Sequence, residues 1–308
     1  MLTRARIRRG LQIAFTGAVV LFVGLYLADQ WDSLRGYPLN IRWGWLLLSQ
    51  VLLTCSLGLL AAPAPLILNA LDSPRPLPVI LRVFFLSNIA KYLPGSIWAL
   101  PGRVYLYQQT GISTARSAVI VFWEVLGMVA GAALIGLLGL PLLAAVLPGW
   151  LLALGAIGML TGALLAINAR RVLPRLPLPA RLRHMLDRPD AWLTSGQIAA
   201  VMALYALAWL AIGIAFTLMV AAVQPLQSAE WWLLLPGLHA IAWVIGFLVI
   251  VAPGGIGVRD ALLVLGMLAL VDEPLPALVA ILARIAWTLA EVSALLLAEF
   301  YYRRVWRR

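Results

Sequence analysis

The sequence predicts an all-α membrane protein with about eight transmembrane helices and two further breaks in otherwise apolar helices. Of the 308 residues, 63% are hydrophobic and only 11% are charged, and the mean hydropathy is +0.98. A water-soluble domain of this length would need large apolar surface patches to reach such values. Several apolar runs also approach the roughly 20 residues that a helix needs to cross the bilayer. We expect residues 1–308 to form a single integral membrane domain.

The expected spans are justified by apolar runs bounded by polar or proline-containing turns. The first run follows the basic amino terminus and lacks a small-residue cleavage site, so it is expected to be a retained span. Pro63 and Pro65 are expected to kink the end of the second span. In the third, Gly127 and Gly131 have the spacing that lets another helix approach closely. The expected spans are 11–28, 45–68, 117–140, 150–168, 197–223, 231–251, 256–271 and 278–302.

The seventh span is the shortest, since its roughly 16 residues reach only about 24 Å. A half-helix that ends in a cavity is therefore the alternative for 256–271. The polar segment 29–42 and the turns at 141–149, 224–230 and 272–274 separate the spans. Most of the tryptophans are expected to lie at the membrane interfaces.

The net charge of +11 arises from 23 Lys and Arg against 12 Asp and Glu. The arginines gather at segment ends, which favours anionic lipid headgroups as partners and makes nucleic acid a poor alternative. The basic amino terminus, the 170–190 loop and the basic carboxyl terminus are expected on the cytoplasmic side of a bacterial inner membrane.

Cofactor and metal sites are not expected. Cys55 is the only cysteine, so an internal disulfide and a cysteine metal cluster are excluded. His184 and His239 are isolated in the sequence, and no nucleophile elbow or nucleotide-binding loop is present.

The stretch from 78 to 109 departs from the apolar pattern. Pro94-Gly95 divides it into two pieces that are each too short to span, which favours a re-entrant pair of half-helices. Asn88 and Lys91 share one helical face with Ser87, and Arg103 in the second piece carries a guanidinium suited to phosphate. The alternative is that Lys91 and Arg103 only extend toward the cytoplasmic interface.

A second break occurs at 253–255. Gly254, Gly255 and Gly257 leave backbone N–H groups that favour an anion site, and Arg259 and Asp260 follow in the first turn of the next helix. Paired breaks of this kind are typical of transporters with discontinuous helices. A tight interfacial turn is the alternative.

Charged residues within the spans complete the candidate site. Arg284, Trp287, Thr288 and Glu291 share one face of the last span. Arg284 is expected to meet the substrate, whereas Glu124, Asp260 and Glu291 are expected to balance charge or to take part in proton coupling. The alternative for Glu124 and Glu291 is that they are fixed counter-ions of the buried cations.

The two breaks resemble the signature stretches of the lysylphosphatidylglycerol synthase transmembrane-region family. The resemblance rests on Asn88-x-x-Lys91-Tyr-Leu-Pro-Gly95-x-Ile-Trp98 with Gly102-Arg103, and on Pro253-Gly-Gly-Ile-Gly-Val-Arg259-Asp260. A glutamate is expected in the family at the position of Asp260. The resemblance implies a polytopic fold with re-entrant helices and movement of lipids or lipid-linked headgroups between leaflets. The chain ends at Arg308, so the soluble aminoacyltransferase domain of bifunctional members is not expected.

We therefore expect a flippase that is not an enzyme and that moves a phosphate-bearing lipid or a polyprenyl-phosphate-linked sugar. Tyr92 and Trp98 are expected to pack on the headgroup or glycan. The alternatives are a membrane transferase with Glu124 or Asp260 as base, and a non-transporting partner of a membrane glycosyltransferase. A glycosyltransferase partner and a homo-oligomer are further expectations. The expected substrate-binding residues are Asn88, Lys91, Tyr92, Pro94, Gly95, Trp98, Arg103, Gly254, Gly255, Gly257, Arg259 and Arg284.

Overall fold

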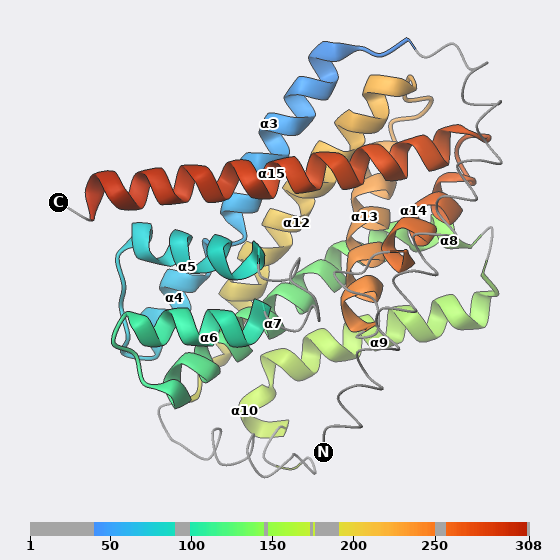
Figure 1. Cartoon of the computed structure of the whole chain (residues 1–308). Coiled ribbons are helices and arrows are strands. Elements are labelled where there is room, and N and C mark those ends of the chain that lie inside the picture. The colour runs from blue at the N-terminus through green and yellow to red at the C-terminus, as the bar shows by residue number, and fades with distance from the viewer. Residues whose placement is uncertain are drawn as a thin grey trace, which may run out of the picture.

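The computed structural model describes residues 40–89, 99–144, 147–172, 175, 191–249 and 257–306. These residues form helices joined by turns and contain no strand (Figure 1). Within them, six helical segments are long and apolar enough to cross a membrane. The protein is therefore an all-α, multi-pass membrane protein, as the sequence predicts. The six segments are Trp43–Ala70, Thr114–Leu143, Gly149–Ile167, Ser195–Val223, Trp231–Leu248 and Leu275–Val305. The expected first span, 11–28, lies outside the described residues.

The first described span is divided into α3 (Trp43–Leu59) and α4 (Ala64–Ala70). Pro63 precedes α4 and Pro65 lies in its first turn, where a fixed φ and a missing N–H are tolerated. The predicted kink at these prolines is confirmed.

Two short helices follow, α5 (Leu77–Ile89) and α6 (Ala99–Gln109), and they pack against each other (Figure 1). Their 13 and 11 residues reach only about 20 and 16 Å, so neither can span the bilayer, as predicted. Arg75 joins their outer ends, because its Nη2 donates to the carbonyl of Thr110 at 2.8 Å. The segment between the helices, 90–98, lies outside the described residues.

The next span consists of α7 (Thr114–Gly136), the 3-10 turn η2 (Leu137–Gly139) and α8 (Leu140–Leu143). The predicted turn at 141–149 begins too early, since Pro141 occupies the first turn of α8, where proline is compatible with a helix. The close approach predicted at the α7 glycines is confirmed. A Cβ atom on Gly131 would lie 2.7 Å from Tyr205 Cβ, and one on Gly127 would lie 2.6 Å from Val201 Cγ1.

Helix α12 (Ser195–Val223) forms the centre of the helical bundle, whereas α9 (Gly149–Ile167) lies at its edge. In their most apolar windows, 72% of α12 is buried but only 11% of α9. We infer that α9 faces lipid. The short α10 (Ala169–Val172) follows α9, and α13 (Trp231–Leu248) follows α12.

The last two helices are α14 (Val258–Met267) and α15 (Leu275–Val305). The expected span at 256–271 is wrong as a full crossing, because the ten residues of α14 reach only about 15 Å. The half-helix alternative fits this length. Helix α15 crosses the molecule and packs against α3, α5 and α14 (Figure 1). Its buried face contains small residues, including Ala283, Ala290 and Ala294, which allow close helix contacts.

The tryptophans do not all lie at the surface of the protein, as an interfacial position requires. Trp43, Trp150 and Trp306 are exposed, whereas Trp123, Trp209, Trp231 and Trp287 are buried. Trp123 is held by a 2.9 Å hydrogen bond from its Nε1 to the carbonyl of Ala191. Hydropathy alone could not distinguish the exposed tryptophans from the buried ones, since helices such as α12 are apolar on every face.

Candidate functional site

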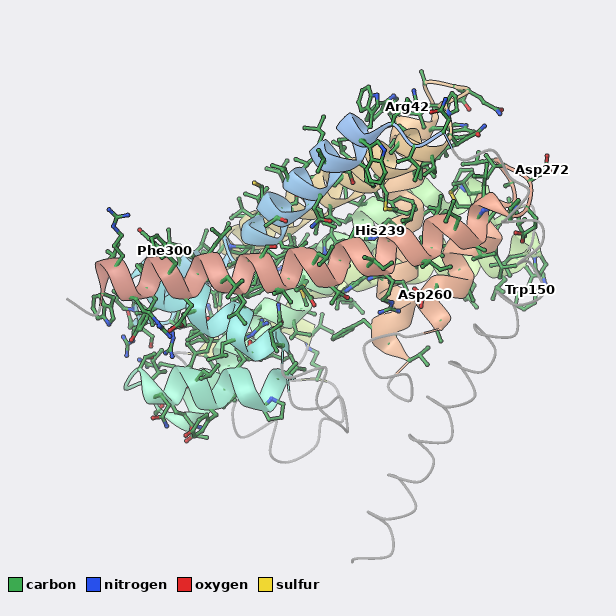
Figure 2. All side chains as sticks on the ribbon, turned by 45° about the horizontal axis from the view of Figure 1, so that its top comes forward. Arg42, Trp150, His239, Asp260, Asp272 and Phe300 are labelled. Atoms are coloured by element: carbon green, nitrogen blue, oxygen red, sulfur yellow. The ribbon has the colours of Figure 1, made fainter. Side chains whose placement is uncertain are left out.

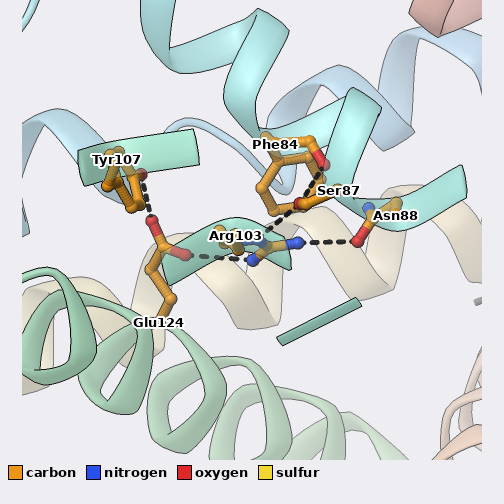
Figure 3. Close-up of polar contacts among 6 residues, drawn as sticks. All are labelled: Phe84, Ser87, Asn88, Arg103, Tyr107 and Glu124. Carbon is orange, nitrogen blue, oxygen red and sulfur yellow. Dashed lines mark hydrogen bonds and ion pairs between the residues drawn. The ribbon is translucent and has the colours of Figure 1, made fainter. Parts of the chain in front are cut away.

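Arg103 is the centre of a buried polar cluster that joins α5, α6 and α7 (Figure 3). Only 2% of the residue is exposed. Its Nε donates to Ser87 Oγ at 2.9 Å, its Nη1 to Glu124 Oε2 at 2.9 Å and its Nη2 to Asn88 Oδ1 at 2.6 Å. The guanidinium carbon lies 4.3 Å from the centroid of the Phe84 ring. We call these residues, with Tyr107, the Arg103 cluster.

Both carboxylate oxygens of Glu124 are engaged in this cluster. Oε2 pairs with Arg103, and Oε1 accepts a 2.6 Å hydrogen bond from the Tyr107 hydroxyl. Glu124 is 1% exposed, and a buried carboxylate of this kind requires a compensating cation. The structure therefore supports the counter-ion alternative for Glu124, and the Arg103 side chain is buried among protein groups.

The sequence prediction identified only part of the Arg103 cluster. The shared face of Ser87 and Asn88 is confirmed, since both contact Arg103. Tyr107 was missed, although its position four residues after Arg103 places both side chains on one face of α6.

A second polar cluster lies where α14 meets α15, and we call it the α14–α15 cluster. Asp260 Oδ2 accepts hydrogen bonds from the backbone N–H of Gly257 at 3.1 Å and from Arg284 Nη2 at 2.7 Å. Gly257 has a φ of +86°, a conformation that glycine adopts without the strain of a side chain. Figure 2 shows Asp260 beside the amino-terminal half of α15. The Arg284 and Asp260 side chains remain 28% and 19% exposed.

The remaining members of this cluster are Arg259, Trp287 and Glu291. Arg259 is 3% exposed and its guanidinium carbon lies 4.9 Å from the centroid of the Trp287 ring. Trp287 Nε1 donates to Glu291 Oε1 at 2.8 Å. The predicted common face of the last span is therefore confirmed for Trp287 and Glu291.

An aromatic cluster from α12, α13 and α15 adjoins Trp287. The ring of His239 lies 5.0 Å from Phe216 and 5.8 Å from Trp287, centroid to centroid, and Trp209 lies 6.3 Å from Trp287. His239 is 3% exposed. The sequence prediction considered this histidine only as a metal ligand. Within the described ranges, no three His, Cys, Asp or Glu side chains gather to hold a metal ion.

The helices that carry the two clusters meet the same long helix, since α15 packs against α5 as well as α14. Figure 1 shows α5 and α6 toward the carboxyl-terminal end of α15 and α14 toward its amino-terminal end. The predicted convergence of the two breaks stays a prediction, because the intervening segments lie outside the described residues. The site residues on those segments are Lys91, Tyr92, Pro94, Gly95, Trp98, Gly254 and Gly255.

The all-α, multi-pass fold matches the polytopic fold that the sequence resemblance implies. A family model of the lysylphosphatidylglycerol synthase transmembrane region matches residues 10–295. Among curated proteins, no sequence matches the chain. The family match covers nearly the whole chain, with five of the six described spans in full and most of the sixth. The chain therefore belongs to the lysylphosphatidylglycerol synthase transmembrane-region family.

Proposed function

We propose that this protein moves a phosphate-bearing lipid between the leaflets of the bacterial inner membrane. The lipid is either a phospholipid or a polyprenyl-phosphate-linked sugar. The observation that carries the proposal is the α14–α15 cluster, in which Arg284 and Asp260 are 28% and 19% exposed beside the buried Arg259. Charged groups among membrane helices are costly unless they are paired or hydrated, so they mark candidate functional sites. The partial exposure of Arg284 and Asp260 lets a ligand reach this pair.

Phosphate is the ligand that best fits the α14–α15 cluster. A guanidinium binds phosphate through two parallel N–H groups, and the amino terminus of α14 adds a positive dipole. Asp260 and Glu291 balance Arg259 and Arg284 in formal charge. Binding a phosphate adds negative charge to this balanced set, and in this proposal the exchange of a proton at a carboxylate offsets it. This exchange provides the proton coupling proposed for Asp260 and Glu291.

The Arg103 cluster has a different role in this proposal. Three nitrogens of Arg103 donate to protein acceptors, so we assign it to positioning α5 and α6 rather than to direct contact with phosphate. Lys91 remains a proposed phosphate ligand, and Tyr92 and Trp98 remain proposed contacts of the headgroup. Because both oxygens of Glu124 are engaged, Glu124 is a poor candidate for a catalytic base, which favours transport over group transfer.

The remaining features of the proposal follow the sequence analysis. Both termini face the cytoplasm, and the protein acts without a cofactor and is not an enzyme. A membrane glycosyltransferase partner and self-association fit this role, and co-purification experiments would test both.

The test is leaflet translocation in vesicles that contain the purified protein and a headgroup-labelled phosphatidylglycerol or polyprenyl-phosphate sugar. We expect the protein to accelerate translocation above that in protein-free vesicles. Lys91→Ala, Arg259→Ala and Arg284→Gln should each slow it by about tenfold or more, since hydrogen bonds to charged groups are worth about 1.5–3 kcal/mol. Arg304→Gln, at the exposed end of α15, should have little effect.

Two outcomes would contradict the proposal. Translocation by Lys91→Ala and Arg259→Ala at the parental rate would show that the site is assigned wrongly. A covalently altered lipid, detected by mass spectrometry after incubation with a donor, would favour the transferase alternative.

A further inference from the structure

Two arginines from different helices share one carboxylate near the carboxyl-terminal end of α15. Arg82 of α5 donates from Nε to Glu299 Oε2 at 2.8 Å, and Arg303 donates from Nε to Glu299 Oε1 at 2.8 Å. The guanidinium carbon of Arg82 also lies 4.6 Å from the centroid of the Tyr302 ring. We call Arg82, Glu299, Tyr302 and Arg303 the α5–α15 arginine cluster.

This cluster has an excess of positive charge and unused donors. Glu299 supplies one negative charge against two guanidinium groups, so one positive charge remains. Each arginine contacts Glu299 through Nε, and among the described residues their terminal nitrogens make no hydrogen bond. The side chains of Arg82 and Arg303 are 36% and 65% exposed. Terminal N–H groups on two neighbouring guanidinium groups match the oxygens of a phosphate.

The surface around the cluster is apolar. Leu296, Leu297 and Phe300 of α15 are each more than 60% exposed, and Leu86 of α5 is 36% exposed. Figure 2 places Phe300 toward the carboxyl-terminal end of α15. In a membrane-spanning helix such side chains contact acyl chains, so the cluster offers charge for a headgroup and apolar surface for its tails.

We propose that Arg82 and Arg303 bind the phosphate of an anionic phospholipid in the leaflet at the carboxyl-terminal end of α15. Glu299 holds the two arginines side by side, and Tyr302 holds Arg82 against α15. The site is separate from the α14–α15 cluster, because the 15 residues from Arg284 to Glu299 correspond to about 22 Å along the helix. The proposal concerns binding alone, so it does not depend on transport.

The test measures lipid binding to the full-length protein in neutral detergent by native mass spectrometry, with phosphatidylglycerol and phosphatidylcholine as probes. The parent should bind phosphatidylglycerol more tightly. Arg303→Gln keeps the Arg82–Glu299 pair and should weaken phosphatidylglycerol binding by about tenfold, the value of one charge-assisted contact. Glu299→Gln removes the carboxylate that holds the two arginines side by side, so it should also weaken phosphatidylglycerol binding although it raises the net positive charge.

Arg304→Gln is the matched control, since it removes the same charge from the next residue, whose guanidinium lies over Phe300 instead of beside Glu299. It should change phosphatidylglycerol affinity by less than about twofold. If Arg303→Gln and Arg304→Gln lose the same amount of phosphatidylglycerol affinity, the lipid is attracted by diffuse positive charge and the proposal is wrong. Equal binding of the two lipids by the parent would also overturn it. Failure of the translocation assay would leave these binding results unaffected.

Discussion

Replacing Glu124 with glutamine tests whether the Arg103 cluster depends on its buried ion pair. In this variant Arg103 would keep its hydrogen bonds to Ser87 and Asn88, but no carboxylate would compensate its charge. The amide of glutamine has a single oxygen to accept from both Arg103 and Tyr107, and its NH₂ group would face one of these donors.

The expected cost follows from the burial of the pair. Arg103 and Glu124 are 2% and 1% exposed, and removing one partner of a buried pair destabilises a protein by about 3–5 kcal/mol. The double variant Arg103→Met/Glu124→Gln buries no charge, so its loss of stability should be smaller than the sum of the two single losses by about 2–3 kcal/mol.

The assay is reversible unfolding in mixed micelles, with the change in unfolding free energy determined for both single variants and the double variant. Glu299→Gln is the matched control, because Glu299 also accepts two hydrogen bonds, from Arg82 and Arg303, but its side chain is 27% exposed. This control should cost less than about 1 kcal/mol. If Glu124→Gln costs no more than Glu299→Gln, or if the two single losses simply add, the buried pair does not hold α6 to α7.

Three further predictions concern helix packing, capping and membrane exposure. Gly131→Ala should destabilise the protein by about 1–3 kcal/mol, because the new Cβ would lie 2.7 Å from Tyr205 Cβ. Gly158→Ala is the control and should not destabilise it, since a Cβ there would have no atom within 4 Å. Thermal unfolding of both variants in the same detergent makes the comparison. Thr194→Ala removes the capping box of α12 and should lower the stability of the protein by about 1 kcal/mol in the same assay. An unchanged unfolding midpoint temperature would contradict this prediction. Cys55 is exposed on α3, within a candidate span, so a charged maleimide should label it slowly in intact vesicles, and rapid labelling would show that this face contacts water.

The membrane spans could be predicted from sequence because the length of an apolar run determines whether a helix can cross the bilayer. Expected and observed bounds differ by a residue or two for 150–168 and 197–223, which correspond to Gly149–Ile167 and Ser195–Val223. The expected span at 256–271 was too long, because the apolar sequence continues beyond the end of α14. Residues 268–271 are apolar but lie in turns after α14.

The candidate site was less predictable, since residue types do not reveal which distant groups meet. The sequence indicated that Glu124 needs a cation but left four candidates, and only the packing of α6 against α7 selects Arg103. The pairing of Asp260 with Arg284 across 24 residues likewise depends on the crossing of α14 and α15. His239 was considered only as a metal ligand, since its aromatic neighbours Phe216 and Trp287 lie on other helices and are distant in the sequence.

The central claim is that the α14–α15 cluster receives a phosphate headgroup, and site-specific photolabelling tests it most directly. A phospholipid with a photoreactive group on its headgroup would be activated in vesicles with the purified protein, and the adducts would be located by mass spectrometry. The account predicts adducts on α14 and on α15 near Arg284, and their loss in Arg259→Ala. Adducts confined to lipid-facing residues such as Leu154 of α9, or unchanged by the substitution, would contradict it.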